Sequence, residues 1–145
     1  MPHNKFSNLV DDFTFLETWE DRYGYIIDLG KQMPELEDEF KVDAAKVEGC
    51  ASQVWLVTWT NCIDGEDEPR FQFKADSDAF IVRGLIAILK ILFNGLPVSE
   101  VVRLNAVDHL NELGLDSHLT PQRSNGLRAM VNRIKQKAES NIDTF

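Results

Sequence analysis

The sequence predicts an α+β fold, in which helices precede and follow a small antiparallel sheet in the middle of the chain. Apolar residues recur at helical spacing in the first part of the chain, up to residue 30, and again from residue 76 onward. Two runs of strand-forming residues, 53–60 and 70–75, lie between these helical parts, with a polar segment between them. Strands that are joined by such a short connection pair antiparallel.

Two helices are expected at the N-terminus, at about Phe6–Leu16 and between Thr18 and Gly30. Thr18 fits an N-cap, because Asp21 follows it at the spacing of a capping box. Gly30 is expected to end the second helix as the first residue beyond it. The link between the helices is short, so they should pack as an antiparallel pair.

About three antiparallel strands are expected, at Ala44–Glu48, Gln53–Thr60 and Arg70–Ala75. The middle one is apolar on both faces, which is typical of a central strand. The last one alternates apolar and polar residues, which is typical of a strand with one buried face. The polar segment before it should form a hairpin turn, which carries Cys62.

The most apolar stretch of the chain predicts the central helix of the core. It opens at Asp76-Ser77-Asp78, where Asp76 or Ser77 is the expected N-cap and Asp78 complements the helix dipole. It stops at Asn94-Gly95. Apolar side chains surround most of its circumference, so this helix should be buried on nearly all sides.

Further helices are expected at about Val98–Leu104, with Pro97 in the first turn, and at about Asp108–Leu113. A C-terminal helix should follow, with Thr120 as N-cap and Pro121 as its first residue. Its predicted inner face is a stripe at helical spacing, made of Leu127, Met130, Val131, Ile134 and Ala138.

Length and composition limit the classes of protein. The 145 residues suit a single domain over residues 1–145, with flexible ends at about 1–5 and 139–145. The chain has 15 basic and 24 acidic residues, a formal net charge of −9, so nucleic acid is not an expected partner. No apolar run suits a membrane span, and no signal peptide is recognised. We therefore expect a cytoplasmic protein; the sequence does not decide whether it forms a homodimer.

Few residues of the sequence are candidates for a metal, phosphate or catalytic site. The three histidines are scattered and no C-x-x-C pair is present, so no metal site is expected. No glycine-rich phosphate loop is found. Cys50 remains, at the tip of a tight loop that leads into a strand. Gly49 before it can take a positive φ or let another backbone approach, and the small residues Ala51 and Ser52 leave room around the sulfur.

The residues alone leave three interpretations of Cys50 open. It is a buried structural cysteine, a hydrolytic nucleophile that His109 or His118 approaches in space, or an accessible thiol that meets another macromolecule. Cys62 is expected to be incidental to the chemistry. A disulfide between the two cysteines would consume the Cys50 thiol.

The stretch Gly49-Cys50-Ala51-Ser52-Gln53-Val54-Trp55 resembles the cysteine loop of the SufE family, sulfur-acceptor partners of cysteine desulfurases in iron–sulfur cluster assembly. The likeness covers about Phe13 to Ala138, with the elements in the family's order. Other stretches that carry it are Tyr25–Gly30, Asp76–Ala79, Ile81–Leu85, Asn94-Gly95, Leu113–Leu115 and Leu119–Leu127.

The resemblance implies a function and its partners. A pyridoxal-phosphate (PLP) cysteine desulfurase takes sulfur from free cysteine and holds it as a persulfide. A SufE-type protein accepts this sulfur on its loop cysteine, stimulates the desulfurase and relays the sulfur to the cluster scaffold. The resemblance implies that Cys50 is the acceptor and that the chain is a covalent sulfur carrier. It also implies that this chain needs no cofactor, because the PLP belongs to the desulfurase. The alternatives are a cysteine hydrolase and a non-catalytic interaction domain.

Supporting roles are expected for residues near Cys50 and in the C-terminal motif. Arg123 is the candidate cation near the thiolate, because a basic residue in the first turn of a helix opposes the helix dipole and so indicates another use. A surface salt bridge is the alternative for this side chain. Asn125 and Gly126 are expected to shape the approach to the sulfur. The loop itself should be set by Gly49, Ala51, Ser52 and Gln53.

Three charged residues at the start of the central helix are candidates for docking a partner. They are Asp76, Asp78 and Arg83, although the two aspartates fit a helix start equally well. Arg83 is also a second candidate for a cation near the thiolate.

Overall fold

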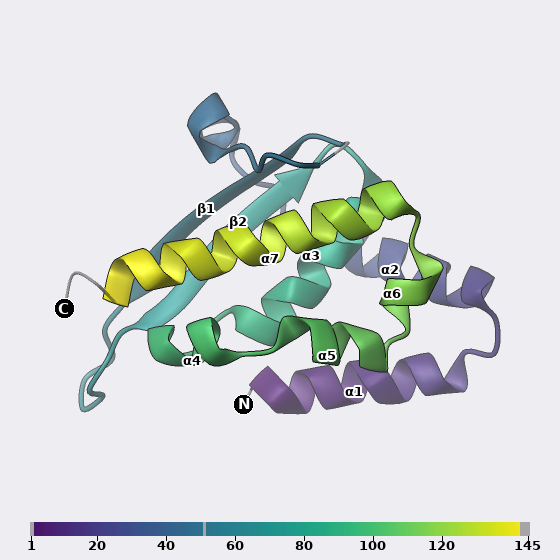
Figure 1. The fold of residues 1–145 in the computed structure, drawn as a ribbon, viewed down its shortest axis with the longest axis horizontal. Helices are drawn as coiled ribbons and strands as arrows, with labels where there is room; N and C mark the ends of the chain where they lie inside the picture. The colour runs from purple at the N-terminus through teal and green to yellow at the C-terminus, as the bar shows by residue number, and fades with distance from the viewer. Residues whose placement is uncertain (1, 51, 143–145) are drawn as a thin grey trace.

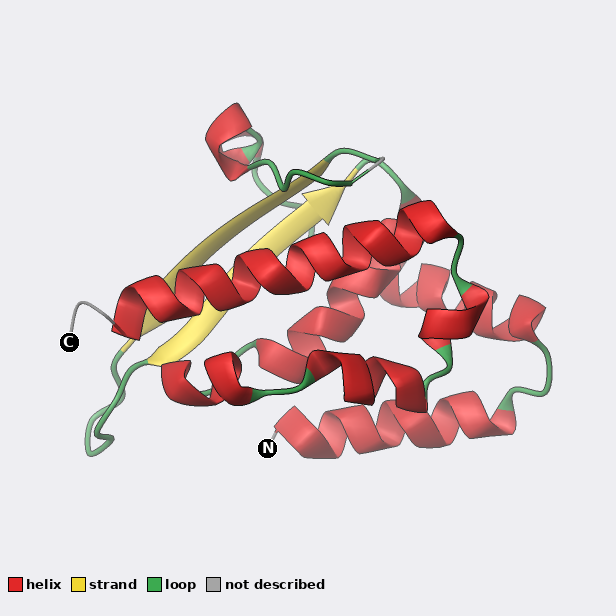
Figure 2. Ribbon diagram, in the orientation of Figure 1, coloured by secondary structure: helices red, strands yellow, loops and turns green. Residues whose placement is uncertain are grey.

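The computed structural model describes residues 2–50 and 52–142 and has the predicted α+β fold. In chain order its elements are α1 Pro2–Phe15, α2 Trp19–Gln32, β1 Val54–Asn61, β2 Arg70–Ser77, α3 Phe80–Phe93, α4 Val98–Arg103, α5 Ala106–Glu112, α6 Leu115–His118 and α7 Pro121–Ile142. The long helix α7 crosses in front of the hairpin of β1 and β2, with α3 behind it (Figure 1). Figure 2 shows both strands on the far side of α7.

The strands β1 and β2 form an antiparallel hairpin that pairs Val54 with Ser77 at one end. β2 continues further than the sequence predicts and includes Asp76 and Ser77. The expectation that one of these two residues caps α3 is therefore wrong. Ala79 holds the N-cap position, without a side-chain cap bond.

The expected third strand, Ala44–Glu48, is not formed. This segment begins in a 3-10 turn, Asp43–Ala45, and then makes one isolated bridge to β1, between Lys46 and Trp55. Alanine is a weak strand former, which favours the turn over a longer ladder. The sheet of the described residues thus has two strands.

Asp76 makes buried contacts and does not cap the start of α3. Its side chain accepts hydrogen bonds from the backbone N–H groups of Leu36, at 3.0 Å, and Ser77, at 2.8 Å, and it forms an ion pair with Arg83. Burial raises the pKa of this carboxyl, but the two N–H groups and the guanidinium outweigh burial and hold its pKa below the usual range. Asp76 therefore stays ionised at neutral pH with its oxygens satisfied.

Arg83 completes this buried network from α3. It is 8% exposed, and besides the ion pair it donates hydrogen bonds to the carbonyl oxygens of Gly30, at 3.2 Å, and Met33, at 2.7 Å. These carbonyls belong to the C-terminal end of α2, where helical carbonyls lack partners within the helix. One guanidinium thus joins the end of α2, the start of α3 and the end of β2.

The helices α2 and α3 touch through glycines. The expectation that Gly30 ends α2 is wrong, since α2 continues to Gln32. A Cβ on Gly30 would lie 2.6 Å from the backbone nitrogen of Gly84, and a Cβ on Gly84 would overlap the carbonyl group of Ile26. Only glycine at these positions lets the two backbones approach so closely.

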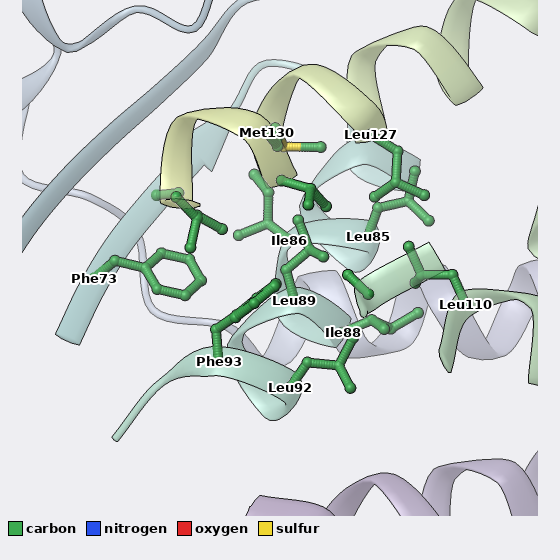
Figure 3. Packing of buried hydrophobic residues seen from close by; sticks show 14 of the residues in the cluster. Phe73, Leu85, Ile86, Ile88, Leu89, Leu92, Phe93, Leu110, Leu127 and Met130 are labelled. Atoms are coloured by element: carbon green, nitrogen blue, oxygen red, sulfur yellow. The ribbon is translucent and has the colours of Figure 1, made fainter. Parts of the chain in front are cut away.

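The helix α3 is the centre of the core, as predicted. Its buried side chains meet Phe73 of β2, together with Leu127 and Met130 of α7 (Figure 3). The predicted start of α7 is confirmed, because the Thr120 hydroxyl accepts a hydrogen bond from the backbone N–H of Arg123, at 3.3 Å. The predicted inner stripe of α7 is buried along its whole length.

The helix ends differ from the sequence prediction in detail. Helix α1 starts at Pro2, before the predicted start at Phe6, and α7 runs to Ile142. The short helix α6 was not expected. No helix in residues 2–50 and 52–142 is both long enough and apolar enough to cross a membrane.

We predict that Gly84→Ala destabilises the protein. The added methyl group forces α2 and α3 apart, and such overpacking typically lowers the free energy of unfolding by about 1–3 kcal/mol. Urea denaturation followed by circular dichroism measures this change. Gly24→Ala in α2 is the matched control, because a Cβ there meets nothing within 4 Å; we expect it to leave stability unchanged or to raise it by up to about 1 kcal/mol. Equal midpoints for Gly84→Ala and wild type would contradict the close contact.

Candidate functional site

Cys50 lies in the loop between the 3-10 turn and β1, and this loop rests on α7. Gly49, the residue before it, has a φ of +91°, a conformation that other residues rarely adopt. A Cβ on Gly49 would come 3.3 Å from the Cβ of Ala129 on α7. The turn at Gly49 therefore places Cys50 against the helix. Ala51, the predicted neighbour on the other side, lies outside the described residues.

The sulfur of Cys50 has a defined position beside Gly126. Its thiol donates a hydrogen bond to the Gly126 carbonyl oxygen, with 3.6 Å between Sγ and oxygen. A Cβ on Gly126 would lie 3.5 Å from Sγ, so the glycine leaves this space open. We call this arrangement of Cys50 against Gly126 the thiol seat.

The thiol seat opens into a pocket of about 240 Å³ between the cysteine loop, α3 and α7. Its lining residues are Cys50, Ser52, Val54, Val82, Leu85, Thr120, Gln122, Arg123, Gly126, Leu127 and Met130. The aliphatic side chains and Met130 are buried, whereas Thr120, Gln122 and Arg123 at the start of α7 are exposed. The pocket therefore combines apolar walls with a polar, cationic side near the surface.

The structure brings together some of the predicted site residues. Ser52, Arg123 and Gly126 line the pocket with Cys50. Asn125 is exposed and is not among the residues that line it. Gln122 was missed, although it stands directly before Arg123 in the motif that carries the resemblance, and this position was the available signal.

Gln53 acts through its backbone. Its N–H donates to Oδ1 of Asp78, at 3.1 Å, and its carbonyl accepts from the N–H of Asp78, at 3.4 Å. Asp78 thereby fixes the point where the cysteine loop enters β1. Of the docking candidates only Asp78 is exposed; Asp76 and Arg83 are 2% and 8% exposed and pair with each other in the interior, which does not fit docking.

The environment of Cys50 keeps its thiol protonated. The residue is half-buried, and desolvation by burial raises the pKa of the thiol above its ordinary value. The hydrogen bond to Gly126 acts in the same direction, because the thiol is the donor. In the thiol seat the sulfur is therefore sheltered and is not activated as a nucleophile.

The histidines do not support the hydrolase interpretation. His109 packs edge-on against Phe6, with ring centroids 5.2 Å apart, and His118 stacks on Trp19 at 3.8 Å. Neither is among the residues that line the Cys50 pocket. Cys50 and Cys62 are both free, and Cys62 is exposed.

A metal centre is not assembled in the part of the chain that the structure describes. Within residues 2–50 and 52–142, no three or more His, Cys, Asp or Glu side chains gather so that they could hold a metal ion. Around the sulfur itself, the described residues that line the pocket include no histidine, aspartate or glutamate.

Comparison with known proteins identifies the family of the chain. The family model "SufE: Fe-S metabolism associated domain" matches residues 7–138. An uncharacterized SufE-like protein of Rhizobium meliloti is 50% identical over 134 residues, which are 92% of this chain and 94% of the relative. A second, from Rhizobium etli, is 52% identical over 132 residues, 90% of this chain and 87% of the relative.

A solved structure shares the fold. The solution structure of a hypothetical protein from Thermus thermophilus superposes with a TM-score of 0.72 and covers 96% of each chain at 16% identity. With the family model spanning nearly all of the described helices and strands and relatives about half identical over nine-tenths of the chain, the protein belongs to the SufE family, which is associated with Fe–S metabolism.

Proposed function

We propose that this protein is a sulfur carrier that accepts a persulfide sulfur on Cys50. The observation that carries the proposal is the thiol seat: a free, half-buried thiol at a pocket that has room beside the sulfur and no histidine among its described lining residues. A hydrolase needs a base next to its nucleophile, whereas a carrier needs a thiol that is sheltered between encounters. Membership of the SufE family supports the same chemistry.

The transfer step needs only the Cys50 thiol and the donor persulfide. The thiolate of Cys50 attacks the outer sulfur of the donor persulfide, the donor's S–S bond breaks, and the donor cysteine leaves as a thiolate. That thiolate takes up the proton that Cys50 released. One S–S bond forms as another breaks, so the step consumes no oxidant or reductant. Passing the sulfur to the next acceptor repeats the same exchange with Cys50 as the leaving group.

The donor in this proposal is a PLP-dependent cysteine desulfurase, and the acceptor is a scaffold of iron–sulfur cluster assembly. The PLP belongs to the desulfurase, so this chain supplies the carrier thiol and no cofactor. A free thiol of this kind suits a reducing compartment such as the cytoplasm. By accepting the sulfur, the chain frees the donor cysteine for another cycle, which accounts for stimulation of the desulfurase.

We infer that the seated and reacting positions of Cys50 differ. Burial and the hydrogen bond to Gly126 hold the thiol protonated in its seat, but attack requires the thiolate. Moving the loop into water removes the desolvation and returns the pKa towards its ordinary value. After transfer, the return of the loop places the new outer sulfur in the pocket, where Arg123 is available to an anionic sulfur.

We predict that Cys50 gains sulfur when the protein is mixed with a cysteine desulfurase and free cysteine. Intact mass spectrometry should show the addition of one or more sulfur atoms, removable by a reductant. Cys50→Ser should gain none, because a serine oxygen cannot form the S–S bond, and Cys62→Ser should load like wild type. Sulfur retained in Cys50→Ser would assign the role to Cys62, and an unloaded wild type with several desulfurases would count against the proposal.

We also predict that the seat suppresses alkylation of Cys50. In Cys62→Ser, the rate of reaction with iodoacetamide should rise with pH, with a midpoint above that of the same protein unfolded in urea. The sign follows from the raised pKa of the folded thiol. Relative to the unfolded chain, the slower labelling is fully present below the unfolded pKa and is lost as the pH rises through the folded pKa. A pKa that is one unit higher lowers the thiolate fraction at neutral pH about tenfold. A folded midpoint equal to or below the unfolded one would mean that the seat activates the thiol.

A further inference from the structure

Arg133 binds the segment that leads to Cys50, although it is not among the residues that line the pocket. It lies on α7, about two turns beyond Gly126. Its Nη1 donates to the carbonyl oxygen of Lys46, at 3.3 Å, and its Nη2 donates to that of Ala44, at 3.0 Å. Both acceptors are backbone groups of the stem of the cysteine loop, by which we mean residues 44–47.

Arg133 shares one face of α7 with the two small residues that receive the loop. Gly126, Ala129 and Arg133 are spaced so that they lie on the same side of a helix. The loop contacts them in order: its stem binds Arg133, Gly49 lies against Ala129, and Cys50 lies against Gly126. The guanidinium supplies two charge-assisted hydrogen bonds at one end of this contact. At the other end the thiol supplies one weak, long hydrogen bond.

The base of the loop is closed on the side of the sheet as well. The N–H of Val47 donates to the carbonyl oxygen of Val54, at 2.9 Å, and Asp78 holds Gln53 by two hydrogen bonds. Among the described residues, Glu48, Gly49, Cys50 and Ser52 lie between these points and outside these backbone hydrogen bonds. Arg133 holds the stem just before them.

We propose that Arg133 is a positioning residue that holds the stem of the cysteine loop on α7 and thereby keeps Cys50 in the thiol seat. The inference deepens the proposed sulfur-carrier function but rests on it only for the transfer step. The seating of the thiol is a property of the protein alone. Without the guanidinium, the stem loses its two side-chain hydrogen bonds to α7 and keeps only its contacts with β1 and the core, so Gly49 and Cys50 are held less firmly on the helix.

Alkylation of Cys50 tests this proposal directly. In a Cys62→Ser background, Arg133→Met removes the hydrogen-bond donors and keeps a long side chain. Because hydrogen bonds from a charged donor are stronger than neutral ones, their loss should speed iodoacetamide labelling of Cys50 by roughly ten- to hundredfold at neutral pH. The pH midpoint of labelling should also move down towards that of the unfolded chain. The labelling rate of Arg133→Lys, which keeps a charged donor, should lie between the rates of Arg133→Met and the protein with Arg133 intact.

The matched control is Arg128→Met, which removes an exposed arginine of the same helix and should leave the labelling rate unchanged. Urea dependence separates loop release from unfolding: release of the loop alone gives a labelling rate that is nearly independent of low urea. A rate in Arg133→Met that matches wild type, or one that rises steeply with urea because the whole protein opens, would overturn the proposal.

Sulfur transfer supplies a second readout. Loaded Arg133→Met should lose its sulfur to a small thiol faster than loaded wild type, because its outer sulfur spends less time in the pocket. Equal rates of loss would contradict the positioning role in transfer. If the wild type takes up no sulfur, the sulfur-carrier function fails, whereas the labelling comparison still decides whether Arg133 seats the thiol.

Discussion

The buried ion pair between Asp76 and Arg83 determines how the two halves of the chain meet. Arg83 donates hydrogen bonds to carbonyl oxygens at the C-terminal end of α2. Asp76 accepts hydrogen bonds from the backbone N–H groups of Leu36, which follows α2, and Ser77 of β2. A buried pair adds little net stability, since desolvation offsets most of the attraction. Its effect in this fold is geometric: it fixes the end of β2, so that Asp78 reaches Gln53 and sets where the cysteine loop begins.

The described position of Cys50 shelters its sulfur. Many catalytic cysteines have a neighbouring base or cation that lowers the thiol pKa. Around Cys50 the first influence is desolvation, and it acts in the opposite direction. In the proposed carrier function this arrangement suits a group that must survive between two encounters, since a persulfide is prone to oxidation. The pocket that raises the pKa of the thiol also has space beside Gly126, where the proposal places the second sulfur.

Sequence patterns predicted the elements whose signals are local. The all-round apolar character of α3, the Thr120-Pro121 start of α7 and the hairpin of β1 and β2 could be found because each depends on neighbouring residues. The position of Cys50 in a loop before a strand could be predicted because its neighbours are small and precede strand formers, whereas its role came from the resemblance to the SufE family. Gly30 and Asp76 were misjudged for a common reason: both fit a local helix-end pattern, but contacts from α3 decide their roles.

Long-range contacts explain which parts of the site could not be predicted from the sequence. Arg133 binds carbonyl oxygens of residues that precede it by 87 and 89 positions, and backbone acceptors leave no trace in side-chain identity. Alanine and lysine at the acceptor positions therefore carry no signal. Arg123 differs from Arg133 in this respect: its place in the first turn of a helix is a local signal, and it lines the pocket with Cys50.

The glycine contact between α2 and α3 has a mechanical consequence for encounters with other proteins. Two backbones in direct contact cannot slide past each other without a clash, so these helices form a stiff frame. The cysteine loop lies outside this frame, against α7. In the proposed sulfur transfer, a partner therefore meets helices that are already in place, and the entropy lost on association is concentrated in the loop around the sulfur.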